Sequence, residues 1–248
     1  MNKNVEIIKE YDTKETAEVS VVISLYNYES YIVETLESVK NQSLEKIDLI
    51  VVDDCSSDNS LALVSAWFEA NKERFNRFLV LHNTHNQKLP TTRNNGLSFV
   101  NTEYVFTLDA DNLLYPRCLE SLLRSIKNSG ADFAYCYLER FGGYGGIQNT
   151  ARWNPNTLRY GNTIDAMVLH RVETMRKLGG YSVMPIQGWE DFEYWFKVAG
   201  IGGWGVRVPE ILARYRVHFD SMIHTETSPK VHKAWEYIKE KHPDFFKD

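Results

Sequence analysis

The chain has 248 residues, of which 43% are hydrophobic and 25% are charged, a composition typical of globular proteins rather than of disordered or coiled-coil ones. Its formal net charge of -5 argues against a nucleic-acid-binding surface, which normally carries a basic excess. The three cysteines, Cys55, Cys118 and Cys136, are widely spaced, so they suggest neither a disulfide framework nor a zinc site. No apolar stretch approaches the ~20 residues that span a bilayer, and the polar start lacks the apolar core of a signal peptide. We therefore expect a cytoplasmic protein without a transmembrane segment.

Strands and helices alternate through the first half of the chain, after a polar lead of about eighteen residues. Enrichment in β-branched residues and apolar residues at helical spacing predict these elements in order: strand 19–25, helix 29–42, strand 47–52, a helix near 61–68 with Asp58 or Ser57 as its N-cap, strand 78–81, helix 91–100, strand 104–108 and helix 117–128. This alternation predicts an α/β fold with a Rossmann-like, mostly parallel sheet and helices on both faces. The sequence lacks both the G-x-G-x-x-G and the G-x-x-x-x-G-K-[ST] loops, which excludes the Rossmann dehydrogenases and the P-loop NTPases.

The second half of the chain is less regular. Its patterns predict, in order, a strand over 133–137, a flexible aromatic and glycine-rich loop over 141–146, a strand over 162–171, a helix over 172–180, a helix over 188–200, a pair of strands at 205–208 and 211–217, and a helix over 231–241. Loops such as 141–146 often line a binding site. No repeat or linker interrupts the chain, so we expect a single domain.

Two carboxylates separated by one alanine follow the apolar run at 104–108. Side chains at i and i+2 of an extended chain point the same way, so Asp109 and Asp111 could bind one hard divalent cation. Ligands of open α/β sheets bind outside the carboxyl ends of the strands, where this pair is expected to lie. The alternative is a simple turn, in which aspartate bonds to its own backbone. The pair therefore indicates a metal site only if other motifs accompany it.

Four separated segments supply that context: VSVVISLYNYESYIVETLESVKNQ, VVDDCSSDNS, TTRNNGLSFVNTEYVFTLDADN and GWEDFEYWFKV. In this order and spacing they resemble the family-2 glycosyltransferases with the GT-A fold, over residues 19–218. The resemblance implies a metal-dependent enzyme that uses Mn²⁺ or Mg²⁺. It also implies transfer of a sugar, with inversion at the anomeric carbon, from a UDP-sugar or similar nucleotide-diphospho-sugar to a hydroxyl acceptor.

The resemblance assigns the donor site to two of these segments. Tyr26 and Asn27 match the positions that pack against the base, and Asp53 and Asp54 match the carboxylates that receive the nucleoside. An acceptor-only carboxylate suits a base N–H or a ribose hydroxyl, although these two acids could also serve only as turn or helix-capping residues. Cys55 stands where the family usually has a glycine, so we expect a slightly different turn there.

The metal and the phosphates are assigned to residues further along the chain. Asp109 and Asp111 match the family's DxD motif, and His218 resembles a histidine that completes the metal shell or contacts the phosphates. Arg93 matches an arginine that holds the DxD region or the donor phosphates, and a structural ion pair with Asp109 or Asp111 is the alternative. A structural role for His218 is equally open.

The last motif, Glu190 followed by Asp191, matches the catalytic pair of the family. The resemblance makes Asp191 the base that takes the proton of the attacking hydroxyl, and Glu190 the residue that orients the acceptor. The alternative is an acidic first turn that stabilises a helix through its dipole.

The resemblance also divides the expected glycosyltransferase domain, residues 1–248, into a nucleotide-sugar-binding half at 19–115 and an acceptor-binding half at 116–248. By family analogy the acceptor is a saccharide or another hydroxyl compound that could be lipid-linked, in polysaccharide or glycan assembly at the inner face of a membrane. The alternative function is that of a catalytically inactive relative that only binds the nucleotide-sugar.

Overall fold

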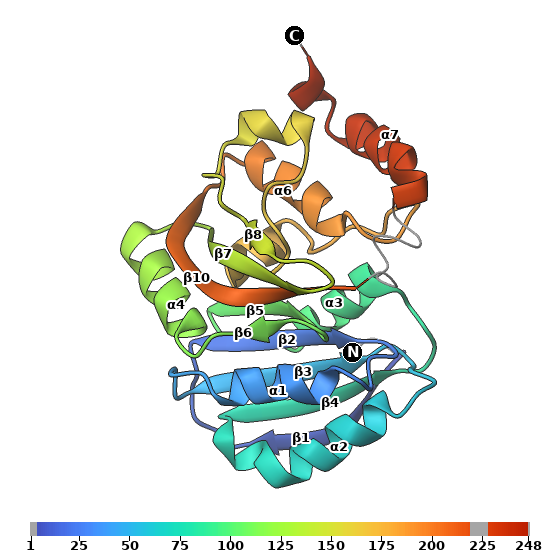
Figure 1. Cartoon of the computed structure of the whole chain (residues 1–248), viewed down its shortest axis with the longest axis vertical. Helices are drawn as coiled ribbons and strands as arrows, with labels where there is room; N and C mark the ends of the chain where they lie inside the picture. The colour runs from blue at the N-terminus through green and yellow to red at the C-terminus, as the bar shows by residue number, and fades with distance from the viewer. Residues whose placement is uncertain (1–3, 219–227, 248) are drawn as a thin grey trace.

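The computed structural model describes residues 4–218 and 228–247, in which a twisted sheet carries helices on both faces (Figure 1). The strands are β1 Val5–Asp12, β2 Val19–Leu25, β3 Ile47–Asp53, β4 Arg77–Asn83, β5 Tyr104–Asp109, β6 Leu113–Leu114, β7 Phe133–Gly142, β8 Gly146–Gln148, β9 Leu169–Arg171 and β10 Gly205–Val217. The α-helices are α1 Ile32–Lys40, α2 Ser60–Asn71, α3 Leu89–Ser98, α4 Cys118–Ser129, α5 Val172–Lys177, α6 Glu190–Gly200 and α7 Val231–Lys241. Short 3₁₀ turns lie at Lys72–Arg74, Pro155–Tyr160, Ser228–Lys230 and Pro243–Phe246.

The strands follow the order β1-β4-β3-β2-β5-β9-β7-β10-β6. Strand β8 lies outside this order and pairs with residues 138–140 of β7. Strands β4, β3, β2 and β5 are mutually parallel, β7 and β10 are parallel to each other, and β1, β6 and β9 run antiparallel to their neighbours. The mostly parallel sheet with helices on both faces confirms the predicted fold class.

The central strands are apolar along their whole length because both of their faces are covered. Every residue of β3 is buried. In β2, Val21 and Ile23 pack into the core under α1, α2 and α4, whereas Val22 faces the opposite core, to which α6 and α7 contribute. Strands of a parallel sheet that is covered on both faces have this continuous apolar pattern. It explains why the sequence located these strands within about two residues.

The sequence predicted no element in the polar lead at the start of the chain, but residues 5–12 form the edge strand β1. It pairs antiparallel with β4, from Val5 opposite Asn83 to Asp12 opposite Arg77. Most of its side chains are exposed or half-buried, so it lacks the apolar run that marked the inner strands. An edge strand with charged side chains also offers little surface for unwanted pairing with another chain.

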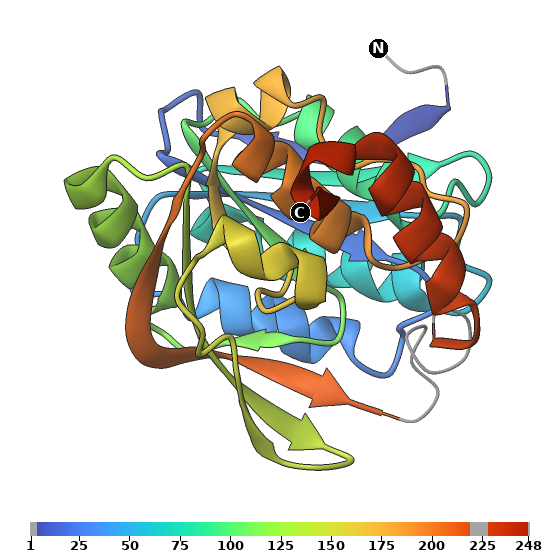
Figure 2. The same ribbon diagram turned by 90° about the horizontal axis from the view of Figure 1, so that it is seen from above.

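The second half also departs from the predicted elements. The two strands expected at 205–208 and 211–217 are one strand, β10, which shifts register around Pro209 and curves strongly, as Figure 2 shows. Proline donates no ladder hydrogen bond, which explains an irregularity at that point. The glycine-rich loop at 141–146 is largely the turn and flanks of the β7–β8 hairpin. Of the strand expected at 162–171, only β9 forms, and the remainder is loop.

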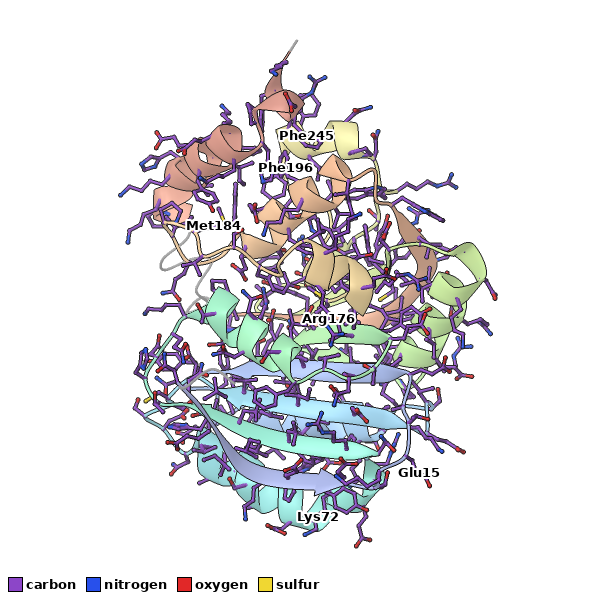
Figure 3. All side chains as sticks on the ribbon, turned by 180° about the vertical axis from the view of Figure 1, so that it is seen from behind. Glu15, Lys72, Arg176, Met184, Phe196 and Phe245 are labelled. Carbon is purple, nitrogen blue, oxygen red and sulfur yellow. The ribbon has the colours of Figure 1, made fainter. Side chains whose placement is uncertain are left out.

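The end of the molecule opposite β1 is held by aromatic packing between α6 and the C-terminal segment. The rings of Phe196 and Phe245 lie 5.2 Å apart, and both are labelled in Figure 3. Trp235 of α7 contacts Phe192 of α6 at 5.3 Å between ring centroids.

Helix α7 has the bounds that the sequence predicted. Within the described residues, no helix combines the length and the apolar character needed to cross a bilayer.

Candidate active site

The carboxyl ends of the central strands meet at one edge of the sheet. Leu25 at the end of β2 lies opposite Asp53 of β3, and Ser24 lies opposite Asp109 of β5. The loops that follow these strands surround a pocket of about 460 Å³. The pocket is lined by Ser24, Leu25, Tyr26, Asn27, Tyr28, Tyr31, Asp54, Asn86, Lys88, Leu89, Thr92, Asp109, Ala110, Asp111, Asn112, Gln187, Tyr215, Arg216 and His218. It therefore gathers six of the residues that the sequence assigned to the donor and the metal.

Asp111 and His218 are brought together by the pairing of β6 with β10, although they lie far apart in the sequence. His218 Nε2 lies 3.0 Å from Asp111 Oδ2. The backbone of Arg216 is tied to the same loop, since its N–H donates to Asn112 Oδ1 at 2.8 Å. Burial raises the pKa of Asp111; the hydrogen bond from His218 opposes this rise, while the charge of Asp109 adds to it.

Arg93, on helix α3, connects the two acidic motifs. Its guanidinium donates to Asp109 Oδ1 at 2.6 Å and to Glu190 Oε1. Helix α3 can approach the sheet this closely because of Gly96, where an added Cβ would lie 2.5 Å from a methyl group of Val22. Both charged side chains of the Arg93–Glu190 pair are almost fully buried. A buried pair of this kind leaves an uncompensated charge if either partner is removed.

Glu190 and Asp191 begin helix α6, but they face different surroundings. Glu190 is 2% exposed, accepts a hydrogen bond from Arg93 and does not line the pocket. Burial raises the pKa of Glu190 to about 7, although Arg93 opposes the rise. Asp191 is half-buried, and its Oδ2 accepts a hydrogen bond from Asn162 Nδ2 at 3.0 Å. Burial likewise raises the pKa of Asp191, against the effect of Arg93. A carboxylate with a raised pKa is better matched to accepting a proton near neutral pH.

Asp53 and Asp54 both lie at the end of β3 but serve different neighbours. Asp54 lines the pocket, and its carboxylate accepts hydrogen bonds from Asn83 Nδ2 at 2.7 Å, from Gln87 N at 2.7 Å and from Lys88 N at 2.9 Å. Asp53 is fully buried beneath the pocket, where its Oδ2 contacts His82 Nδ1 at 2.8 Å and the backbone N–H of Ser56 at 3.2 Å. Both carboxylates thus organise the loops around the pocket, whatever they contact in a bound nucleotide.

The loops after β2 and β3 are fastened to each other. Asn27 Oδ1 accepts a hydrogen bond from Ser57 N at 2.8 Å, and Asn27 N donates to Ser56 Oγ at 3.0 Å. Cys55 has a φ of +61°, in the left-handed region that favours glycine. The backbone at Cys55 therefore has a conformation that glycine would adopt more easily, and whether the turn differs from that of the family stays a prediction. Tyr26 is 44% exposed, which leaves its ring available to a ligand.

The sequence also missed residues of the pocket. Lys88 has a φ of +70°, precedes α3 and lines the pocket, where it supplies a cation near the place expected for the donor phosphates. Tyr28 and Tyr31 pack their rings against His218, with centroids 6.1 and 5.7 Å away. The sequence around Tyr28 and Tyr31 did not indicate this contact, because His218 follows β10, far along the chain.

The predicted metal ligands are only partly assembled. Over residues 4–218 and 228–247, no group of three or more His, Cys, Asp and Glu side chains is arranged to hold an ion. Asp111 and His218 are in contact, whereas Asp109 is turned toward Arg93. Two carboxylates and an imidazole are nevertheless suitable donors for Mn²⁺ or Mg²⁺.

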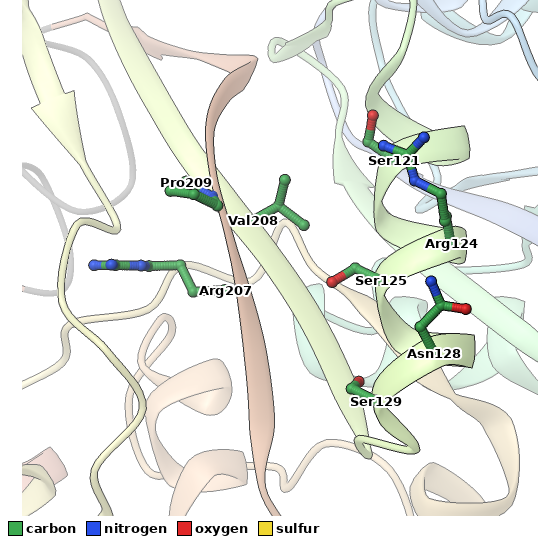
Figure 4. Close-up of a pocket in the computed structure, with 8 residues that line it drawn as sticks. All are labelled: Ser121, Arg124, Ser125, Asn128, Ser129, Arg207, Val208 and Pro209. Atoms are coloured by element: carbon green, nitrogen blue, oxygen red, sulfur yellow. The ribbon is translucent and has the colours of Figure 1, made fainter.

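A second hollow, of about 340 Å³, lies between α4 and β10 (Figure 4). Its lining consists of Ser121, Arg124, Ser125, Asn128, Ser129, Arg207, Val208 and Pro209. Arg207 points away from α4, and its guanidinium lies 5.3 Å from the ring centroid of Tyr137. This lining contains no carboxylate or histidine, so it offers neither a base nor a metal ligand.

Comparison with known proteins agrees with this geometry. The model of the glycosyl transferase family 2 matches residues 20–179. The poly(ribitol-phosphate) beta-N-acetylglucosaminyltransferase TarP of Staphylococcus aureus (strain N315) is 36% identical over 116 residues, which cover 46% of this chain and 34% of TarP. The chain spans about a third of the length of the first curated relatives it matches.

Solved structures share the architecture at lower identity. TarS of S. aureus in complex with UDP-GlcNAc has a TM-score of 0.72 and 19% identity, covering 84% of this chain and 61% of the TarS chain. The mannosyltransferase PcManGT of Pyrobaculum calidifontis, in complex with GDP-Man and Mn²⁺, has a TM-score of 0.66 and 18% identity, covering 93% of this chain and 63% of its own. The fold is that of the GT-A glycosyltransferases, and with the family match the chain belongs to glycosyltransferase family 2.

Proposed function

We propose that the protein is a metal-dependent, inverting glycosyltransferase that moves one sugar from a nucleotide-diphospho-sugar, most simply a UDP-sugar, to a hydroxyl acceptor. The observation that carries this proposal is the bridge through Arg93, which joins Asp109 of the DxD motif to Glu190, the neighbour of Asp191. The bridge supports the proposal because it joins the motif proposed for the donor to the residue next to the proposed base. The complexes of TarS with UDP-GlcNAc and of PcManGT with GDP-Man support a nucleotide-sugar as the donor.

The donor would occupy the pocket of about 460 Å³, with its base near Tyr26 and Asn27 and its phosphates between Lys88 and the DxD motif. Asp109, Asp111 and His218 would hold Mn²⁺ or Mg²⁺, and phosphate oxygens and water would complete its coordination. The chemistry that a bound cation supplies is neutralisation of the negative charge that develops on the leaving diphosphate.

Asp191 would act as the base in a single displacement. Its carboxylate takes the proton of the acceptor hydroxyl while that oxygen forms a bond to the anomeric carbon, and the bond from this carbon to the diphosphate oxygen breaks. The attack comes from the face opposite the leaving group, so the configuration inverts. Asn162 would orient Asp191 through its hydrogen bond to Oδ2. Glu190, held by Arg93, would position the start of α6 and only indirectly the acceptor.

The first test is a thermal-stability screen with nucleotides and nucleotide-sugars, each with and without Mn²⁺, because a ligand that binds only the folded state raises its stability. We expect one UDP-sugar with Mn²⁺ to give the largest rise in Tm. If no nucleotide changes Tm under either metal condition, the donor pocket is assigned wrongly.

The second test is Asp191→Asn, assayed by release of UDP from the donor found in the screen. We expect turnover to fall by about 10²- to 10⁴-fold, the usual contribution of a general base, while the ligand-induced rise in Tm is retained. Glu173→Gln is the control, because this exposed acid begins α5 and lies outside the pocket lining. An Asp191→Asn protein with more than half of the wild-type turnover would rule out Asp191 as the base.

A further inference from the structure

A hollow of about 430 Å³ adjoins the donor pocket, and the two share Tyr215 and Arg216 in their linings. The rest of its lining comes from the β7–β8 hairpin and from the loops around residues 149–151 and 162–165. Asn162 belongs to this lining and donates to Asp191, so the hollow reaches the proposed base.

Asp165 brings one unused carboxylate oxygen to this hollow. Its Oδ1 accepts a hydrogen bond from Met167 N at 3.0 Å, and its own backbone N–H donates to Asn149 Oδ1 at 2.9 Å. Among the described residues, no hydrogen bond is made to Asp165 Oδ2, and this residue lines the hollow. Asp165 lies close enough to Asp109 and Asp191 for the charges of both to raise its pKa. The carboxylate is therefore fixed in place with an acceptor to spare.

Asn149 supplies the complementary group. Its Oδ1 is committed to Asp165 N, which fixes the orientation of the side-chain amide. The residue is only 6% exposed. Its Nδ2 is buried and has no hydrogen-bond partner in the described part of the chain. Buried amide donors are nearly always paired, so the unpaired Nδ2 of a residue that lines the hollow is a candidate donor to a molecule bound there.

The two arginines that line the hollow already have hydrogen-bond partners. Arg216 donates through Nε to the carbonyl oxygen of Asp111 and through its guanidinium to Glu34. Arg140 donates through Nε to Gln148 Oε1 at 2.7 Å and lies over the ring of Tyr144. With these partners in place and the carboxylate of Asp165 in the wall, the hollow is suited to neutral hydroxyl groups more than to phosphate or carboxylate.

We propose that Asp165 and Asn149 form an acceptor subsite that recognises neighbouring hydroxyls of a saccharide or polyol, with one hydroxyl donating to Asp165 Oδ2 and the next accepting from Asn149 Nδ2. This inference rests on the proposed function, since it takes the bound molecule to be the acceptor. Both residues are positioning residues that present the attacking hydroxyl to Asp191. They come from the irregular part of the chain, where acceptor choice is expected to reside.

The probes for this subsite are ribitol and the methyl β-glycosides of glucose, galactose and N-acetylglucosamine, and their binding is followed by saturation-transfer NMR. Each probe is tested with the wild-type protein alone and with UDP and Mn²⁺. We expect at least one probe to bind, and Asp165→Asn to weaken its binding by about fivefold or more while the affinity for UDP changes less than twofold. Asn149→Gly, which keeps the positive φ of 61° accessible, should weaken the same probe.

The readouts separate the subsite from the donor site. Glu173→Gln, outside both linings, should bind probe and UDP as the wild-type protein does. If no probe binds while UDP does, or if Asp165→Asn and Asn149→Gly bind every probe within twofold of wild type, the subsite is wrong and the donor assignment stands. If UDP fails to bind while a probe binds in an Asp165-dependent way, the subsite stands as a hydroxyl-binding site and the proposed function is wrong.

Discussion

The two sides of the candidate site are built by different means. On the donor side, the carboxylates follow directly from parallel strands, and Asp54 is fixed by three hydrogen bonds from a single neighbouring loop and the end of β4. On the base side, Glu190 and Asp191 begin helix α6, whose apolar side chains pack into the core on one face of the sheet. Arg93 of α3 joins the start of this helix to Asp109 through two ion pairs. The donor side is thus an outcome of sheet topology, whereas the base side also contains a buried ion pair between distant parts of the chain.

The largest effect is expected from Arg93→Met, which keeps most of the length of the side chain but removes its charge. Glu190 is then left buried beside Asp109 and Asp191 without a cation, and we expect the free energy of unfolding to fall by about 3–5 kcal/mol. Denaturant unfolding measures the loss. Activity should fall as well, because the start of α6 loses its tie to the sheet.

The matched control for Arg93→Met is the double variant with Glu190→Gln, which removes the unpaired charge. We expect it to recover part of the lost stability, since replacing both partners of a buried pair costs less than replacing one. A single variant that loses less than about 1 kcal/mol would show that Arg93 does not hold the two sides together.

The difference between the two sides also explains which parts of the fold could be predicted from the sequence. The strands next to the donor pocket are apolar on both faces, so their ends, and the acids that follow them, could be located from local pattern alone. The edge strand β1 has no such pattern, because most of its side chains are exposed or half-buried. The fold class followed from the inner strands and did not need β1.

The contacts of the site were less accessible to prediction. The sequence placed Arg93 beside the DxD motif and left open an ion pair with Asp109, which the structure contains. It did not predict the second partner, Glu190, because that contact joins residues that lie 97 positions apart in the chain. Asn149 and Asp165 both lie in loops. The sequence pattern placed Asp165 within an expected strand over 162–171 and marked neither residue as part of a site. The roles of the predicted site residues in binding and catalysis stay predictions.

A smaller effect is expected from pH, again on the base side. Burial raises the pKa of Asp165 to about 7, and the charges of Asp109 and Asp191 add to the rise. A folded-state pKa above the unfolded value of about 3.9 means that the folded protein binds the proton more tightly. The stabilising contribution of the protonated group is then complete below about pH 4 and is lost as the pH rises through about 7.

Relative to wild type, Asp165→Asn should therefore gain stability between pH 4.5 and pH 8, because asparagine does not titrate. We expect the gain to be about 1–2 kcal/mol, less than the full shift implies, since water reaches this half-buried side chain. Denaturant unfolding at the two pH values measures it, with Glu173→Gln as the control that should show no such trend. A difference between Asp165→Asn and wild type that does not change with pH would contradict the raised pKa.

The smallest effect is expected at the hollow between α4 and β10, which is away from both sides of the site (Figure 4). Arg124 is exposed there, and Arg124→Ala should change the free energy of unfolding by less than about 0.5 kcal/mol, as exposed substitutions usually do. Release of UDP from the donor should also be unchanged, because this hollow shares no residue with the donor pocket. A loss of activity without a loss of stability in Arg124→Ala would mean that the chemistry reaches beyond the strand ends, and that the two-sided description of the site is incomplete.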